Sequence, residues 1–124
     1  MIYTSYFAKL KSLPSGITPI AICYNTPIWY MGPTYKKLAP TYNMIRKYKQ
    51  DHDTKEYTNK FEAQILSNLN VHEVIQDLEA LGSTLLHWSG DICLICYEKS
   101  SDFCHRHLVA DWFRQAGYEC EEWY

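Results

Sequence analysis

The segment "DICLICY", Asp91 to Tyr97, is the most apolar stretch of the chain and decides the class of fold. A short, continuous run of Ile, Leu and Cys is typical of a strand that is covered on both faces, as strands of parallel sheets are. The segment "ITPIAICY", Ile17 to Tyr24, has the same character. We therefore expect a small sheet with helices packed on both sides.

Apolar residues at helical spacing predict four helices, and shorter β-rich segments predict two further strands. The helices are expected at Thr41–His52, Lys55–Leu69, Val71–Leu81 and His105–Ala116, and the strands at Ile2–Phe7 and Tyr118–Trp123. Asn70 is the expected cap of the third helix, and Gly82 its end. The order predicts one three-layer α/β domain over residues 1–124, with a small, mostly parallel sheet flanked by helices.

The composition fits a folded domain and excludes several classes of protein. Apolar residues make up 47% of the 124 residues, and the net charge is −2. A broad basic surface for duplex nucleic acid is therefore not expected. We find no apolar run long enough to span a membrane and no signal-peptide pattern. Five cysteines without a framework spacing favour a reducing, cytoplasmic setting.

The segment "EKSSDFCHRH", Glu98 to His107, follows the most apolar strand and holds most of the candidate site residues. Side chains alternate along a strand, so Cys93 and Cys96 should point to opposite faces, which argues against a CxxC zinc knuckle. Cys96 and Glu98 should share one face near the carboxyl end of the strand.

The last helix should begin within this segment, with Ser101 or Asp102 as its cap. Cys104 would then lie in the first turn, where the helix dipole lowers the pKa of a thiol. Arg106 would add positive charge and form an anion clamp with the helix N-terminus. Helical spacing turns His105 toward the apolar stripe and His107 toward solvent.

Ligands of open α/β sheets bind beyond the carboxyl ends of the strands. The predicted topology brings three segments to that edge: Ser5–Phe7, Tyr97–Arg106, and Tyr24–Tyr35 with the long loop Asn25–Pro40. Three aromatic residues of this loop are expected to contact a ligand: Trp29, Tyr30 and Tyr35. Aromatic rings provide large contact areas at a low cost in conformational entropy.

A metal site is the weaker alternative for the same residues. Cys96, Cys104 and His105 could form a thiolate-rich site, but the sequence offers no obvious fourth ligand. We therefore predict no cofactor and keep a divalent metal ion as the alternative.

The segment "LICYEKSSDFCHRHLVADWF", Leu94 to Phe113, resembles the hallmark of the DUF488 family. That hallmark is a hydrophobic strand ending in Cys-x-Glu, a short loop, and Cys-His-Arg at the start of a helix. Five residues match it one for one: Cys96, Glu98, Cys104, His105 and Arg106. The segment "PIWYMGPTYKKLAP", Pro27 to Pro40, resembles a compact, single-domain branch of the family. One departure is the run Ser100, Ser101 and Asp102, where members often have a proline.

The resemblance implies an α/β fold and a catalytic or binding site at the five matching residues, but it implies no reaction, because the family is uncharacterised. The leading hypothesis is an enzyme or binding domain for a small anionic, nucleotide-like molecule. Cys104 would be its nucleophile or redox-sensitive thiol, Glu98 its general acid or base, and His105 the residue that orients them. The alternatives are an interaction module in which the cluster is structural, and a single-stranded nucleic-acid binder.

Overall fold

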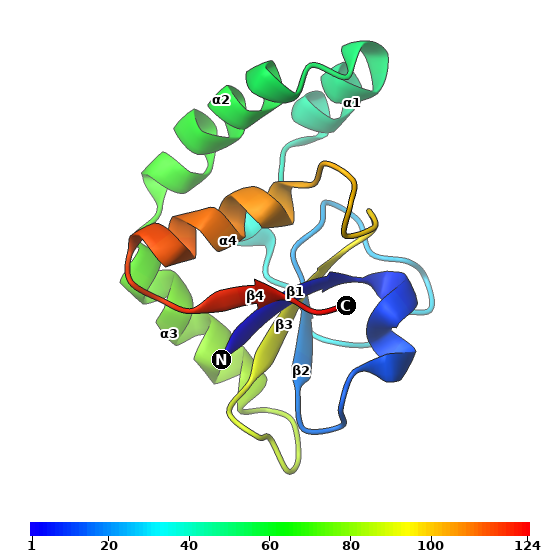
Figure 1. The fold of residues 1–124 in the computed structure, drawn as a ribbon, viewed down its shortest axis with the longest axis vertical. Helices are drawn as coiled ribbons and strands as arrows, with labels where there is room; N and C mark the ends of the chain where they lie inside the picture. Colours follow the sequence, from blue (N-terminus) through cyan, green and yellow to red (C-terminus); the bar gives the residue numbers. More distant parts are fainter.

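A computed structural model describes residues 1–124 and shows a four-stranded parallel sheet (Figure 1). The strands are β1 (Ile2–Tyr6), β2 (Thr18–Ala21), β3 (Ile92–Cys96) and β4 (Cys120–Glu122), in the spatial order β2-β3-β1-β4. All three strand pairs are parallel, and Ile2 lies opposite Ile92 and Cys120. The α/β class and the short final edge strand are confirmed.

The helices of the structure follow the predicted order. They are α1 (Tyr42–Asp51), α2 (Thr54–Gln64), α3 (Val71–Gly82) and α4 (His105–Gln115), with short 3-10 helices at Phe7–Ser12, Lys36–Leu38 and Leu66–Asn68. Helices α1 and α2 form a pair at one end of the molecule, next to α4 (Figure 1). Thr41 and Asp53 cap them, since each side chain accepts a hydrogen bond from a backbone N–H of the first turn.

Two apolar clusters cover the two faces of the sheet. The larger contains residues of all four helices, and the smaller packs Phe7 and residues of the loop after β2 against the opposite face. Every residue of β3 is buried, as expected for the strand with helices or loops on both sides. Cys96 packs in the larger cluster and Cys93 in the smaller, so the two cysteines do point to opposite faces.

The structure corrects one helix boundary and the cap of the last helix. The predicted helix Lys55–Leu69 ends at Gln64, because the side chains of Ser67 and Asn68 bond to the last free carbonyls of α2. Asn70 caps α3 as predicted. Helix α4 begins at His105, so Cys104 is its N-cap and does not lie in the first turn. Neither Ser101 nor Asp102 caps this helix.

None of the helices has the length and apolar character that crossing a lipid bilayer requires.

Candidate functional site

A cavity of about 530 Å³ lies at the carboxyl ends of β2 and β3 and extends to α1, α2 and the start of α4. Six aromatic side chains contribute to its lining: Tyr24, Tyr42, Tyr48, Tyr57, Tyr97 and Phe103. The polar and reactive side chains in the lining include Lys49, His52, Cys96, Glu98, Cys104 and His105. The cavity thus lies at the edge of the sheet where the topology predicted a site.

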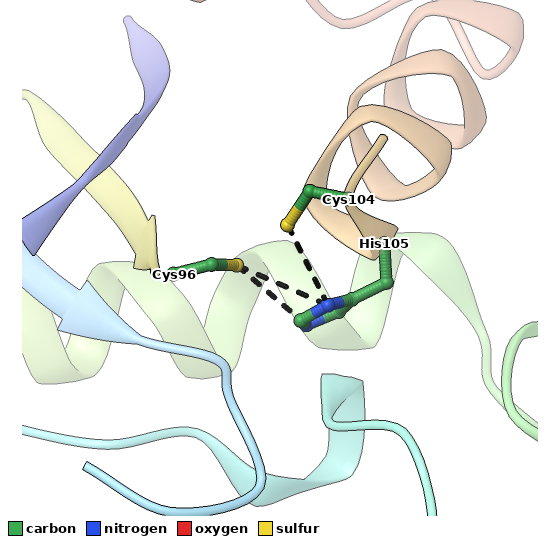
Figure 2. Close-up of side chains that lie close together, drawn as sticks. All are labelled: Cys96, Cys104 and His105. Atoms are coloured by element: carbon green, nitrogen blue, oxygen red, sulfur yellow. Dashed lines mark hydrogen bonds between the residues drawn. The ribbon is translucent and has the colours of Figure 1, made fainter. Parts of the chain in front are cut away.

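Figure 2 shows three residues of this lining, Cys96, Cys104 and His105, with both sulfur atoms directed toward the imidazole ring. The Nε2 atom of His105 lies 2.7 Å from the carbonyl oxygen of Ile22, which can only accept a hydrogen bond. Nε2 therefore carries a proton, and Nδ1 of the neutral ring is an acceptor. Cys104 Sγ lies 3.8 Å from that Nδ1 atom. The backbone of the segment after β2 thus orients His105 as a base for Cys104.

The environment of Cys104 favours its thiolate, although its side chain is buried. Burial raises the pKa of this thiol, but contacts with Cys96 and His105 and the positive charge of Arg106 outweigh that effect. The net result is a pKa well below the ordinary value. A thiolate is the nucleophilic form of cysteine, so the site is suited to nucleophilic chemistry.

Cys96 contributes the second sulfur of the site and remains a thiol. Burial and the neighbouring Cys104 raise its pKa well above the ordinary value. Its Sγ atom lies 3.9 Å from Nδ1 and 3.7 Å from Nε2 of His105. Nearly equal distances to both ring nitrogens place this sulfur beside the ring and not in line with the Nδ1 lone pair.

The three side chains are close enough to be candidate metal ligands, with all ligand atoms within 4.8 Å of one another. A metal ion bound to Nδ1 of His105 would lie on the side of Nδ1 away from Nε2. A sulfur that shares this ion would be much farther from Nε2 than from Nδ1, which the position of Cys96 does not satisfy. The observed arrangement is therefore that of a thiol–imidazole pair with a second thiol beside it.

Glu98 lines the same cavity from the segment that follows β3. The residue as a whole is exposed, but burial of its carboxyl group and the nearby Cys104 raise its pKa to about 7. A carboxyl group with this pKa can both give and take a proton near neutral pH, which is the property of a general acid or base.

This raised pKa predicts a specific pH dependence of stability. The pKa of Glu98 is higher in the folded protein than the ordinary value of 4.5, so the folded state loses stability as pH rises from about 4.5 to about 7. The substitution Glu98→Gln removes this loss. Thermal unfolding at pH 5 and pH 8 should therefore show a smaller drop in Tm for the variant than for the wild type. The exposed Glu79→Gln substitution is the control and should leave the drop unchanged.

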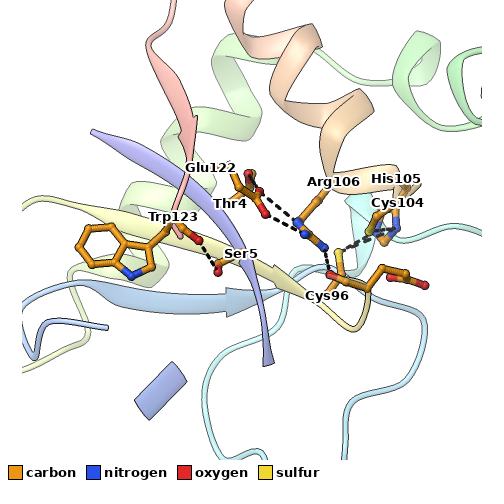
Figure 3. Close-up of polar contacts among 9 residues, drawn as sticks. Thr4, Ser5, Cys96, Cys104, His105, Arg106, Glu122 and Trp123 are labelled. Atoms are coloured by element: carbon orange, nitrogen blue, oxygen red, sulfur yellow. Dashed lines mark hydrogen bonds and ion pairs between the residues drawn. The ribbon is translucent and has the colours of Figure 1, made fainter. Parts of the chain in front are cut away.

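Arg106 lies outside the cavity lining and is fully buried (Figure 3). Its Nε and Nη2 atoms donate to both carboxylate oxygens of Glu122, at 3.2 and 2.8 Å, and its Nη1 atom donates to the carbonyl oxygen of Glu98 at 2.7 Å. Thr4 donates to the same carboxylate at 2.5 Å. This geometry makes Arg106 a structural link between α4, β4 and the end of β3, in place of the expected anion clamp.

The structure does not bring Trp29, Tyr30 and Tyr35 to the cavity. Trp29 is 59% exposed and packs edge-on against Phe7. The hydroxyl of Tyr30 donates to the carbonyl oxygen of Pro33 at 2.8 Å, and that of buried Tyr35 donates to Asp77 at 2.6 Å. Only the two ends of the loop, at Tyr24–Asn25 and Pro40, reach the cavity.

The aromatic residues that α1 and α2 contribute to the cavity were not predicted as site residues from sequence. Tyr48 shares the apolar face of α1 with Met44, so its spacing assigned it to the core. Its ring stacks on Phe103 at 5.2 Å between centroids, and both rings line the cavity. The role of Glu122 as the partner of Arg106 was not predicted either, because nothing in the sequence of a short edge strand indicates that its carboxylate pairs with a buried arginine.

His105 is less exposed than His107, as the helical spacing predicted, but His107 is less exposed than expected. His105 is buried, whereas His107 is half-buried with its Nε2 atom enclosed and without a hydrogen-bond partner.

Comparison with known proteins gives one match. The family model DUF488-N3a, described as the active DUF488-N3 subclade, matches residues 26–117, which is more than half of the chain. The matched range contains the Cys-x-Glu and Cys-His-Arg residues and the Pro40 end of the loop, and it begins directly after Asn25 at the other end. No curated protein and no solved structure matches the chain.

Proposed function

This chain belongs to the DUF488 family, and we propose that it is an enzyme acting on a small, anionic, nucleotide-like molecule through a Cys104 thiolate. The observation that carries this proposal is the chain of contacts from Cys104 Sγ to His105 Nδ1, and from His105 Nε2 to the Ile22 carbonyl oxygen. A nucleophile, a base and a group that orients the base are the parts that thiol catalysis requires. The description of the matched subclade as active supports an enzymatic role.

The lining of the cavity supports the proposed class of ligand. Tyr42, Tyr48 and Phe103 offer faces or edges on which a planar base can pack. Lys49 and His52 come from the end of α1 and can provide positive charge for a phosphate or carboxylate. A concave site lined mainly by apolar and aromatic side chains, with a few polar groups, is typical of small-molecule sites.

The reactive groups define a two-step reaction. Cys104 Sγ forms a bond to an electrophilic carbon of the ligand, and the leaving group departs with the proton that His105 has taken from the thiol. Water then attacks the carbon, the C–S bond breaks and the thiolate returns. His105 or ionised Glu98 accepts the proton of the attacking water. The net reaction is hydrolysis, and no external oxidant or reductant is consumed.

A panel of the four common ribonucleoside monophosphates tests the proposal. At least one is expected to raise the Tm of the wild-type protein and to be converted to a product visible by chromatography. The Cys104→Ser variant should bind the same nucleotide but lose turnover by about 1000-fold, because a serine hydroxyl is not ionised by this dyad.

Two aromatic residues of nearly equal exposure provide a matched comparison. Tyr42, at 57% exposure, lines the cavity, whereas Trp29, at 59%, does not. Tyr42→Ala should therefore abolish the Tm shift with nucleotide, and Trp29→Ala should retain it. Absence of saturable binding across the panel, or equal losses in both variants, would contradict a nucleotide-like ligand in this cavity.

A further inference from the structure

Three thiols line the cavity, those of Cys23, Cys96 and Cys104, although the proposed reaction uses only one. Cys96 and Cys104 both line the cavity, and their sulfur atoms lie within 4.8 Å of each other. Cys23 is not part of the close group of Cys96, Cys104 and His105, and its thiol donates to the carbonyl oxygen of Asn25. Cys93 packs on the opposite face of β3. Cys96 is therefore the cysteine placed to react with Cys104.

The backbone around the two thiols allows them to approach further. Cys104 is the N-cap of α4, with extended backbone angles, and its side chain makes no capping hydrogen bond. Its sulfur can therefore move without breaking a hydrogen bond of the helix. Cys96 is the last residue of β3, and the residues from Tyr97 to Phe103 form a loop outside regular helices and strands. The two cysteines thus lie at the two ends of a loop outside regular secondary structure, with sulfurs that have to approach from within 4.8 Å to the roughly 2.05 Å of a disulfide bond.

We propose that Cys104 and Cys96 form a reversible disulfide when a hydroperoxide enters the cavity, and that this disulfide switches off the site. The inference rests on the proposed role of Cys104 as a reactive thiolate. The oxidant is a hydroperoxide, the simplest being hydrogen peroxide, and the reductant that reverses the reaction is a small thiol.

The reaction balances in two steps. The Cys104 thiolate attacks one oxygen of the peroxide, the O–O bond breaks, and hydroxide leaves as water after taking the proton held by His105. The product is a sulfenic acid on Cys104. Cys96 then attacks this sulfur, the S–S bond forms, and the hydroxyl group leaves as water with the Cys96 proton. Two thiols and one peroxide give one disulfide and two waters.

The environments of the two cysteines fit this division of roles. The contacts that favour the thiolate of Cys104 make it the attacking group, and burial keeps Cys96 protonated until the sulfenic acid forms beside it. The disulfide also protects Cys104 from further, irreversible oxidation. Because the nucleophile is consumed, nucleotide turnover should stop and resume after reduction.

Tryptic digestion makes the disulfide directly measurable. Lys99 separates the two cysteines, so cleavage after Lys60, Lys99 and Arg106 yields the peptides 61–99 and 100–106. After treatment of the folded protein with hydrogen peroxide, these peptides should appear as one linked species without reductant and separate after addition of dithiothreitol. The intact mass should fall by two hydrogens.

Cysteine variants identify the partner and separate the two proposals. Cys93→Ala should still form the link, because Cys93 lies on the same peptide as Cys96 but on the other face of the strand. Cys96→Ala and Cys96→Ser should instead accumulate a Cys104 sulfenic acid that dimedone traps. Circular dichroism establishes which variants are folded.

Peroxide treatment that gives no link in wild-type protein, while iodoacetamide still labels Cys104 rapidly, overturns the disulfide and leaves the proposed function standing. If peroxide gives no link and iodoacetamide does not label Cys104 either, both the disulfide and the proposed function are contradicted.

Discussion

Replacement of Arg106 by alanine is expected to lower the free energy of unfolding by about 3–5 kcal/mol. The guanidinium is fully buried and holds Glu122 with two hydrogen bonds and the Glu98 carbonyl with a third. Its removal leaves the carboxylate of Glu122 almost buried without its cationic partner. Because small domains have a total stability of only about 5–15 kcal/mol, the loss would be a large part of it. Urea unfolding followed by circular dichroism measures the change.

Two further variants test the cause of this loss. The double variant Arg106→Met with Glu122→Leu removes both charges and should recover much of the stability, since apolar replacements of a buried pair are often neutral. Lys60→Ala breaks an exposed ion pair with Glu56 and should cost at most about 1 kcal/mol. A loss in Arg106→Ala no larger than that in Lys60→Ala would show that the link does not stabilise the fold.

Acid should weaken the same link. Burial raises the pKa of the Glu122 carboxyl group, but hydrogen bonds from Arg106 and Thr4 outweigh this and hold the pKa below the ordinary value. A carboxyl group with a lowered pKa stabilises the folded state above its unfolded pKa, and that contribution is lost as pH falls through the folded value. The Arg106 link and Glu98 therefore give pH dependences of opposite sign.

Replacement of His105 by glutamine is expected to slow the reaction of Cys104 with iodoacetamide at pH 6.5 by about 100-fold, because a thiol of ordinary pKa is only about 1% ionised at that pH. In wild-type protein the rate should depend much less on pH between pH 6 and pH 9, since contacts in the folded protein hold the pKa of Cys104 well below the ordinary value. In His105→Gln it should rise about tenfold per pH unit up to about pH 8.5. Mass spectrometry of the peptide 100–106, in which Cys104 is the only cysteine, measures each rate.

The control for this experiment is His72→Gln, which changes an exposed histidine that contacts Tyr118 far from the cavity lining. Its labelling rate should equal that of the wild type. If the wild-type rate itself rises tenfold per pH unit below pH 8, Cys104 is an ordinary thiol and the dyad does not activate it.

The class of fold could be predicted from sequence because its signals are local. The apolar runs of β2 and β3 and the cap of α3 each depend on a few neighbouring residues, and each was confirmed. Strand alternation also placed Cys93 and Cys96 on opposite faces correctly. The same local rules predicted that His105 is buried.

The roles of the site residues depend on partners far along the chain, and local rules do not predict these. The orientation of His105 comes from a carbonyl 83 residues away, and the partner of Arg106 is a carboxylate on the last strand. Three of the cavity aromatics, Tyr42, Tyr48 and Tyr57, come from helices α1 and α2, whose position against α4 no periodicity reveals. Adjacent residues of the Cys-His-Arg motif therefore have different functions: Cys104 and His105 face the cavity, whereas Arg106 holds the framework behind it.

The order of strands in the sheet also bears on how fast the protein folds. Strand β1 pairs only with β3 and β4. The hydrogen bonds of Met1 with Asp91 and of Thr4 with Glu122 join residues that are 90 and 118 positions apart in the chain. Closing such long loops costs conformational entropy before any pairing energy is gained, so folding rates fall as the mean sequence separation of contacts rises. The helical segment from α1 to α3 can form local structure early, but the hydrogen bond that orients His105 on the Ile22 carbonyl requires that the central strands have joined. Assembly of the site should therefore be a late event in folding.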